Sequence, residues 1–403
     1  MLAAADGDVA GAEDALADAF ERALDRWPVD GVPDKPDAWL LTVARNRQRD
    51  RWKSAAARTA VPLDPDRDSG VHFDDIDPDG IVDNRLALML VCAHPAIDPS
   101  VRTPLMLNTV LGFTAAQIAT AFAMPTSALA ARLVRAKNRI KNAHIPFRIP
   151  DRTVLPDRMS SVLEAVYGVF AIDWHIGGTE TRAGFGGEAL YLAETLAELA
   201  PDDAEAHGLA ALICMSDARL PARFDAAGDL VPLADQDIGS WDAALIERGA
   251  NHLRIAHGLG VLGRFQLEAA IQSVHAARGV TGQTDWVTLR ELHLVLDAVA
   301  PTIGGSVAMA AVTAEIDGPE AGLSTLDAIA DQERFQPAWS TRAHLLSALG
   351  REDDARSAFD RAISLTTDPA QRAHLERRRR ALSQPPSAQP TTSPVRIGQR
   401  VCE

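Results

Sequence analysis

The sequence predicts an all-α protein, and three observations favour that class. Alanine is abundant, while aromatic residues make up only 5% of the 403 residues and include two tyrosines. This composition favours helices over sheets. Apolar residues recur at helical spacing in several segments. Clusters of Gly, Pro and Asp separate these segments. The length is sufficient for two or three domains.

Composition also excludes several classes of protein. No apolar run reaches the ~18–20 residues of a membrane span, and the acidic N-terminus lacks the pattern of a signal peptide. Cys92, Cys214 and Cys402 are too few for a disulfide framework and predict a reducing compartment. A net charge of −15 argues against a protein that simply coats nucleic acid. We therefore expect a cytoplasmic protein that does not enter a membrane.

The first predicted helix covers residues 11–27. Its large apolar residues lie at helical spacing and are expected to form its buried face: Leu16, Phe20, Leu24 and Trp27. Its acidic residues form a second stripe on the same helix: Asp14, Asp18, Glu21 and Asp25. Such a stripe suits a basic protein surface or plain solvation.

The second predicted helix covers residues 37–53, and Asp37 is its expected N-cap. It mixes two tryptophans, Trp39 and Trp52, with four arginines: Arg45, Arg47, Arg49 and Arg51. Aromatics beside arginines suit unpaired bases and their backbone. The alternative is that Trp39 lies in the core and the arginines in water. We assign residues 1–60 to this first domain and residues 61–83, rich in Pro, Asp and Gly, to an acidic linker.

Residues 84–150 predict several short helices that end in a helix-turn-helix. Thr114 is expected to cap a helix that ends near Phe122, and Thr126 to open a longer helix that ends near Asn142. On the longer helix an apolar stripe (Leu129, Leu133, Ala136, Ile140) runs beside a basic stripe (Arg132, Arg135, Arg139). The alternative is an ordinary hairpin with a solvated basic face. No acidic residue occurs between positions 99 and 150, and this favours phosphate binding.

Residues 151–382 predict one helix after another, and residues 383–403 a disordered tail rich in Pro, Ser, Thr and Gln. Two segments, 308–329 and 340–363, fit a weak tetratricopeptide pattern. Residues 153–403 carry 21 basic and 34 acidic side chains, whereas residues 99–150 carry seven basic side chains. These opposite charges predict direct contact between the C-terminal domain and the basic helices.

No catalytic pattern stands out in the chain. It has no nucleophile elbow, phosphate-binding loop, dinucleotide fingerprint or zinc-protease motif. Cys92 and His94 are two possible metal ligands, but no second pair follows at zinc spacing. The sequence therefore predicts neither an enzyme nor a metal or cofactor site.

Several segments together resemble a bacterial RNA polymerase sigma factor of the extracytoplasmic-function (ECF) type. GAEDALADAF (11–20) is similar to the polymerase-binding region 2.2, and AWLLTVARNRQRDRWK (38–53) to regions 2.3–2.4, which melt and read the minus-ten element. GFTAAQIATAFAMPTSALAARLVRAKNRIK (112–141) is similar to region 4, which reads the minus-35 element. The segments RLVRAKNRIKNAHIPFRIP and DARLPARFDAAGDLVPLADQD resemble a subgroup with a long helical, tetratricopeptide-like C-terminal extension, thought to replace a separate regulator.

The resemblance implies roles for particular residues. It implies that Asp14, Asp18 and Glu21 face core polymerase. It places four residues at minus-ten DNA: Arg45, Asn46, Asp50 and Arg51. At minus-35 DNA it places Thr126, Ser127, Arg132 and Arg135, and the basic stripe adds Arg139.

The chain also departs from the family pattern. Region 2 normally has a further helix before the region 2.2 motif, and here only ten residues precede Gly11. Either the start codon is misassigned or region 2 is shortened. The alternative function is a helical-repeat scaffold whose basic N-terminal part binds nucleic acid without polymerase.

Overall fold

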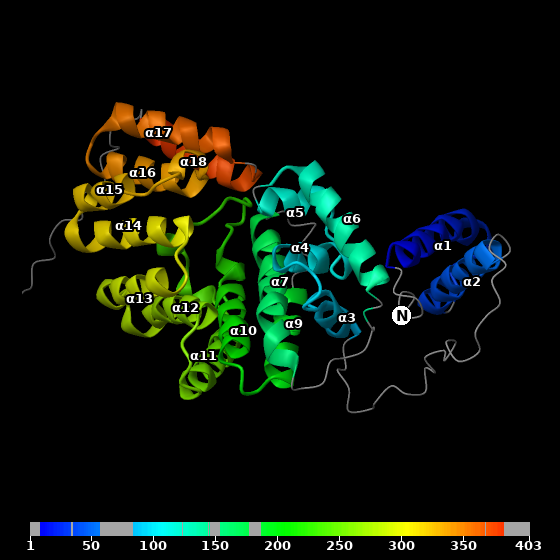
Figure 1. Ribbon diagram of the computed structural model, residues 1–403. Helices are drawn as coiled ribbons and strands as arrows, with labels where there is room; N and C mark the ends of the chain where they lie inside the picture. Colours follow the sequence, from blue (N-terminus) through cyan, green and yellow to red (C-terminus); the bar gives the residue numbers. More distant parts are fainter. Residues whose placement is uncertain are drawn as a thin grey trace, which may run out of the picture. The chain divides into compact units, whose positions relative to one another are not determined.

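The computed structural model describes residues 9–33, 35–56, 84–122, 124–143, 145, 154–176, 187–366 and 368–382. Within these ranges every regular element is a helix, apart from an isolated bridge between Phe224 and Leu230, so the predicted all-α fold is confirmed (Figure 1). The chain divides into two compact units. Unit 1 comprises Met1–His175 with Glu180–Ala200, and unit 2 comprises Ile176–Thr179 with Pro201–Glu403. The predicted linker (61–83) and tail (383–403) lie outside the described residues.

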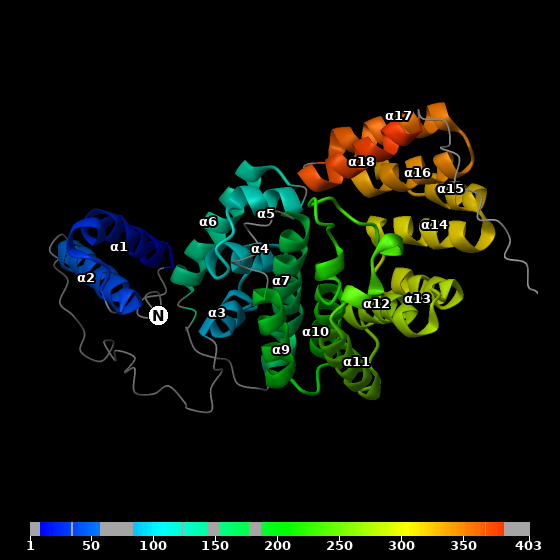
Figure 2. The same ribbon diagram turned by 180° about the vertical axis from the view of Figure 1, so that it is seen from behind.

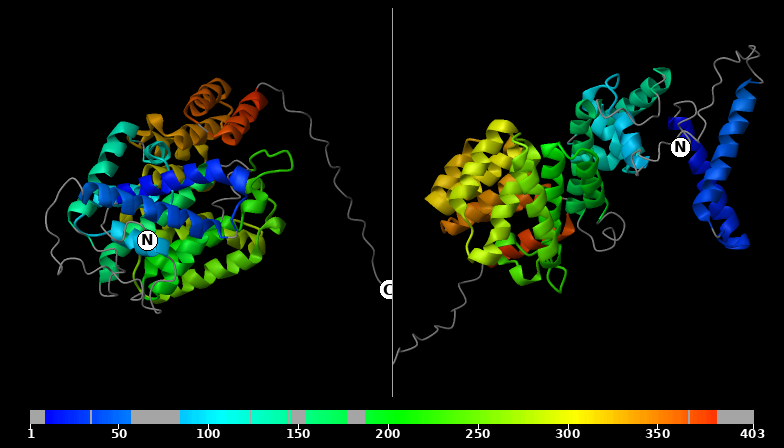
Figure 3. Two further views of the ribbon diagram at one scale, coloured as in Figure 1. Left: turned by 90° about the vertical axis from the view of Figure 1, so that its right-hand side faces the viewer. Right: turned by 90° about the horizontal axis from the view of Figure 1, so that it is seen from below.

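Unit 1 begins with a pair of helices that lie side by side, α1 (Val9–Asp30) and α2 (Pro36–Ala56) (Figures 1 and 3). Both predicted helices are confirmed, but the predicted buried face of α1 is wrong. Phe20 is 50% exposed and Leu24 is 77% exposed. The residues that α1 buries against α2 are alanines instead: Ala15, Ala19 and Ala23.

Small side chains explain this choice of face. Alanines let two helices approach closely, and the larger residues Leu16, Trp27 and Trp39 then pack at the border of the contact. The rings of Trp27 and Trp39 meet edge to face, with centroids 5.6 Å apart. Trp39 thus contributes to the hydrophobic core of the hairpin, as the second of the two interpretations expected.

Four short helices follow, α3 (Asn84–Cys92), α4 (Pro99–Thr109), α5 (Ala115–Ala121) and α6 (Thr126–Asn142). Their core is made of fully buried aliphatic side chains from all four helices: Leu86, Met89, Leu105, Met106, Ile118, Leu129 and Ile140. This core holds α6 with its apolar stripe inward.

Helices α7 (Leu155–Ile176) and α9 (Glu188–Leu199) belong to unit 1 as well. Arg158 donates from Nη1 to the carbonyl oxygen of Leu90 at 2.8 Å, and Thr103 donates to the carbonyl oxygen of Ser161 at 3.5 Å. Gly168 packs closely on the side chain of Leu107. The compact unit therefore extends to Ala200, whereas the charge pattern placed a domain boundary after residue 150.

Unit 2 contains nine described α-helices, which Figure 2 shows from behind: α10 (Ala204–Asp217), α11 (Ala243–Gly258), α12 (Arg264–Thr281), α13 (Trp286–Val299), α14 (Ile303–Asp317), α15 (Pro319–Asp327), α16 (Gln336–Ala348), α17 (Glu352–Leu365) and α18 (Pro369–Ala381). Their hydrophobic clusters follow the chain order. One cluster joins α12 to α13 and α14, the next joins α14 to α15 and α16, and a third joins α15 to α18. Contacts between neighbours in the chain are typical of repeat proteins.

Helix α10 differs from the others because it is buried almost all round, from Ala206 to Ser216. Glu205 at its start accepts the backbone N–H groups of Phe265 and Gln266, at 2.9 and 3.0 Å. These contacts satisfy the first turn of α12, whose N-cap Gly263 has no side chain to do so. No described helix combines the length and the apolar character that crossing a bilayer requires.

Candidate nucleic-acid interface

Helices α5 and α6 begin and end where the sequence predicts. The Thr114 hydroxyl accepts the backbone N–H of Gln117, and the Gln117 side chain accepts the backbone N–H of Thr114, so a capping box fixes the start of α5. Helix α6 begins after Pro125, which supplies no side-chain cap. The predicted apolar stripe is buried: Leu129, Leu133, Ala136 and Ile140. The arginines beside this stripe therefore remain at the surface of α6.

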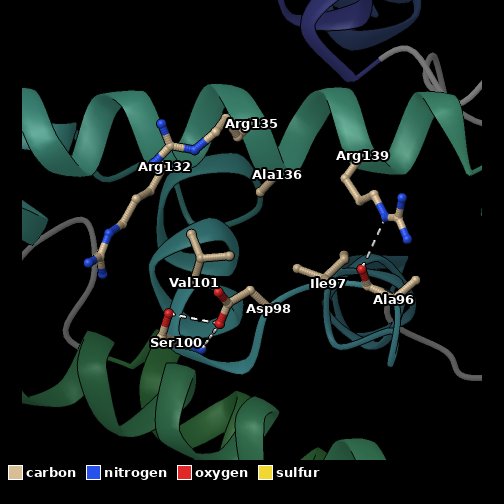
Figure 4. Close-up of a pocket in the computed structure, with 9 residues that line it drawn as sticks. All are labelled: Ala96, Ile97, Asp98, Ser100, Val101, Arg132, Arg135, Ala136 and Arg139. Atoms are coloured by element: carbon tan, nitrogen blue, oxygen red, sulfur yellow. Dashed lines mark hydrogen bonds between the residues drawn. The ribbon is translucent and has the colours of Figure 1, made fainter.

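Arg132, Arg135 and Arg139 line one side of a cleft of about 490 Å³, and the segment 96–101 lines the other (Figure 4). All three arginines are exposed. Nε of Arg139 donates to the carbonyl oxygen of Ala96 at 3.4 Å. Guanidinium groups that follow one another along two helical turns can contact successive phosphates of a nucleic-acid backbone. The structure thus brings together the three arginines that the sequence singled out.

Asp98 is the acidic residue among those lining this cleft. Its Oδ1 accepts the backbone N–H and the hydroxyl of Ser100, both at 2.9 Å, and thereby caps the N-terminus of α4. The bonds from Ser100, followed by the nearby charges of Arg132 and Arg102, hold the pKa of Asp98 below its usual value. Asp98 therefore places a fixed negative charge in the same cleft as the arginines, and this charge opposes the binding of a phosphate there.

Thr126 and Ser127 are exposed in the first turn of α6, a turn that contains no acidic residue. Hydroxyl and backbone N–H groups at a helix start are typical phosphate contacts. Lys137 of the same helix has a different role, because its ammonium group contacts the Glu13 carboxylate at 2.6 Å and is largely buried. Sequence reasoning missed this pair and also missed Asp98 and Ser100. The Asp-Pro-Ser start of α4 was the signal available for those two residues.

The residues predicted on α1 differ in their surroundings. Asp14 and Glu21 are exposed, whereas Asp18 is half-buried and accepts Nε of Arg47 at 2.5 Å. This ion pair links α1 to α2 within the hairpin. Asp18 is therefore engaged within the hairpin, and Asp14 and Glu21 are the residues of the predicted set that have the larger exposed fraction.

The residues predicted on α2 are described in part. Arg45 and Asn46 are exposed on the helix. The side chains of Asp50 and Arg51 lie outside the described part of the molecule. The structure therefore brings two of these four residues to the surface of α2.

The pair Cys92 and His94 does not form a metal site. Cys92 is buried, and burial raises the pKa of its thiol to about 12. His94 Nδ1 accepts the backbone N–H of Ala96 at 3.1 Å, and burial lowers the pKa of this imidazole. Across the described residues, no group of three or more His, Cys, Asp or Glu side chains is arranged to hold a metal ion.

Two family profiles match parts of the chain. The sigma-70 region 2 profile matches residues 4–58, which include the α1–α2 hairpin. The match covers the N-terminal part of the chain, which is therefore similar to region 2 of the sigma-70 proteins. A second profile, described as a family of unknown function (DUF6596), matches residues 158–257, from α7 to the end of α11.

One relative matches the chain over nearly its whole length. The chain is 34% identical to Uncharacterized protein R00370 of Rhizobium meliloti (strain 1021) over 380 residues, which cover 90% of this chain and 88% of the relative. The chain belongs to the same family as this protein. No solved structure matches the chain.

Proposed function

We propose that the chain is a sigma factor of the ECF type that binds core RNA polymerase and directs it to specific promoters. The proposal depends on two features that occur in the same chain. Residues 4–58 match sigma-70 region 2, and the helix pair α5–α6 carries three arginines along one cleft. Polymerase binding is assigned to α1, minus-ten DNA to α2 and minus-35 DNA to α6. The protein then acts in the cytoplasm, with RNA polymerase.

The binding to core polymerase is tested through the acidic residues of α1. We expect Asp14→Arg combined with Glu21→Arg to abolish capture by immobilised core polymerase, because both residues are exposed and the change inverts their charge. Asp18 is tested separately by Asp18→Asn, since an arginine there would also face Arg47. The matched control is Asp297→Arg on an exposed part of α13.

Transcription in vitro with core polymerase and genomic promoter fragments decides between the two functions. A sigma factor yields promoter-dependent transcripts, and the Asp14/Glu21 variant yields none. DNA binding with no capture of polymerase and no transcript would support the scaffold alternative instead.

The C-terminal helices are assigned a regulatory role in the same chain. The subgroup resemblance and the acidic charge of residues 153–403 support direct contact with the sigma part and a positive effect on transcription. Because unit 1 ends at Ala200, the regulatory role is tested with a chain that ends there. Truncation after residue 150 would remove α7 from Leu90 and Leu107, whereas a chain that ends at Ala200 keeps the described helices of unit 1.

We expect the chain that ends at Ala200 to give reduced promoter activity while its circular dichroism spectrum retains the helical signal of unit 1. Full activity of this chain would contradict a required regulatory role. A small-angle scattering curve of the full chain that shows two independently moving halves would contradict the contact.

A further inference from the structure

Unit 2 encloses arginines where the chain passes from α10 towards α11. Arg219 follows α10 and donates from Nη2 to Oε1 of Gln272 on α12 at 2.7 Å. Arg278, in the last turn of α12, donates from Nη2 to the carbonyl oxygen of Leu233 at 2.8 Å. Both contacts are to neutral acceptors. Charged side chains are rarely buried unless an opposite charge accompanies them.

Trp241 lies beside Arg278, the arginine whose charge also acts on Arg219. It is only 6% exposed, and the guanidinium carbon of Arg278 lies 5.4 Å from the centre of its ring. Three N–H groups of this cluster are shielded from water and find no acceptor among the described residues: Nε of Arg219, Nε of Arg278 and Nε1 of Trp241. A buried donor that lacks an acceptor costs about 1–3 kcal/mol, and more when it is charged.

The charged groups that shift the pKa values of Arg219 and His275 are basic side chains. Burial, together with the charges of Arg223 and Arg278, lowers the pKa of Arg219 to about 10. The pKa of His275 on α12 falls to about 4, through burial and then through Arg219, Arg278 and His293. Among the described residues, no carboxylate contributes to either shift. The cluster is therefore an enclosed region of positive potential that lacks a described counter-charge.

We propose that Arg219, Arg278 and Trp241 form a binding site for the phosphate group of a small molecule, either inorganic phosphate or a phosphomonoester. Guanidinium groups match the geometry of phosphate oxygens, and an indole N–H supplies a further donor. The unpaired donors would then gain acceptors and the buried cations a counter-charge. A nucleic-acid backbone does not fit here, because Arg219 and Arg278 are half-buried, Trp241 is buried, and a polymer needs an open groove.

The segment between α10 and α11 contacts the cluster through the carbonyl oxygen of Leu233, which accepts Arg278. Residues 220–240 contain three single turns of 3₁₀ helix, at Leu220–Ala222, Leu233–Asp235 and Ile238–Ser240. Short turns of this kind are held by few hydrogen bonds and open more readily than α-helices. We expect phosphate to enter through a local opening of this segment.

The test is thermal unfolding of the full chain in inorganic phosphate, in glycerol 3-phosphate and in sodium chloride at equal ionic strength. We expect a saturable rise in Tm with phosphate beyond that with chloride. A larger rise with the ester than with inorganic phosphate would identify a phosphorylated metabolite as the ligand. Equal Tm values in phosphate and chloride would overturn the proposal.

Variants assign the effect to the cluster. Arg219→Gln should weaken phosphate binding, measured by titration calorimetry, at least tenfold. Arg254→Gln, at an exposed arginine of α11, should leave it unchanged. Equal binding by Arg219→Gln and the original chain would contradict the site.

A second measurement does not require a variant and so remains valid if Arg219→Gln does not fold. Nuclear magnetic resonance of the His275 ring should show its pKa rise when phosphate is added, because a bound anion offsets the neighbouring cations. An unchanged pKa of His275 at saturating phosphate would place the anion elsewhere and overturn the proposal.

Discussion

The arginines of α6 and the arginines of unit 2 are the same residue type in opposite surroundings. Arg132, Arg135 and Arg139 are exposed along a cleft, whereas Arg219 and Arg278 are half-buried and Arg278 lies against the buried ring of Trp241. Exposed cations can follow a long polyanion and release its counterions. Enclosed cations have lost their hydration and need one well-placed counter-charge. Burial, more than residue type, therefore determines which anion each group suits.

The largest expected effect concerns the pH dependence of unit 2. The pKa of His275 is about 4 in the folded chain, below the usual 6.5, so the unfolded chain binds more protons between these values. The stability that neutral His275 contributes is present above pH 6.5 and is lost as pH falls towards 4. At about 1.4 kcal/mol per pKa unit, the loss is on the order of 3 kcal/mol.

Denaturant unfolding at pH 7 and pH 5 measures how the free energy of unfolding changes with pH. His275→Gln should make this change smaller, whereas His257→Gln, at an exposed histidine, should not alter it. Phosphate should also reduce the slope, if the enclosed arginines bind it. A His275→Gln chain with an unaltered pH slope would show that the cluster does not govern this imidazole.

The next effect concerns the close packing that encloses the arginines. A Cβ atom at Gly208 of α10 would lie 2.6 Å from the backbone nitrogen of Gln266 on α12, a contact that the backbone must move to relieve. We expect Gly208→Ala to destabilise the chain by about 1–3 kcal/mol. Gly258→Ala is the matched control, because nothing lies within 4 Å of that position. Equal urea midpoints for the two variants would contradict this packing.

A smaller effect is expected from Asp98, the acidic residue lining the α6 cleft. Asp98→Ala removes the N-cap of α4 and should cost about 1 kcal/mol of stability. It also removes a negative charge beside Arg132, so affinity for promoter DNA should rise. Asp285→Ala removes the equivalent cap of α13 and should cost a similar amount without changing DNA affinity, as measured by fluorescence anisotropy.

The smallest effect on stability is expected at Arg132 and Arg135, where we expect the largest effect on DNA binding. Arg132→Ala with Arg135→Ala should change the free energy of unfolding by less than about 0.5 kcal/mol, because both residues are exposed. Each lost phosphate contact should reduce the slope of log K against log salt by about 0.9. Arg254→Ala should leave that slope unchanged, and an unchanged slope in the double variant would assign the two arginines to a solvated face.

Much of the candidate interface was predictable because its signals are local. The capping box of Thr114 and Gln117 fixes where α5 begins, and a helical period of apolar residues fixes which side of α6 is buried. The capping box and the apolar period each depend on residues that are close to one another in the chain. Both features can therefore be recognised from a single sequence. The basic stripe of α6 was predictable for the same reason.

The buried face of α1 was not predictable in this way. Helical spacing of the larger apolar residues predicted a buried face that included Phe20 and Leu24. The structure buries Ala15, Ala19 and Ala23, because the close approach of α2 requires small side chains. That approach is a property of two helices together, and neither helix alone specifies it.

By itself, the sequence determined the helical class, the ends of α5 and α6 and the basic stripe on α6, since short-range hydrogen bonds and periodicity decide these features. The tertiary structure alone decided which distant residues become neighbours: the 96–101 segment opposite α6, α7 packed on α4 within unit 1, and Arg278 against the buried Trp241 in unit 2. These contacts join residues that are far apart in the chain. They depend on how complete helices pack and on which charges that packing removes from water.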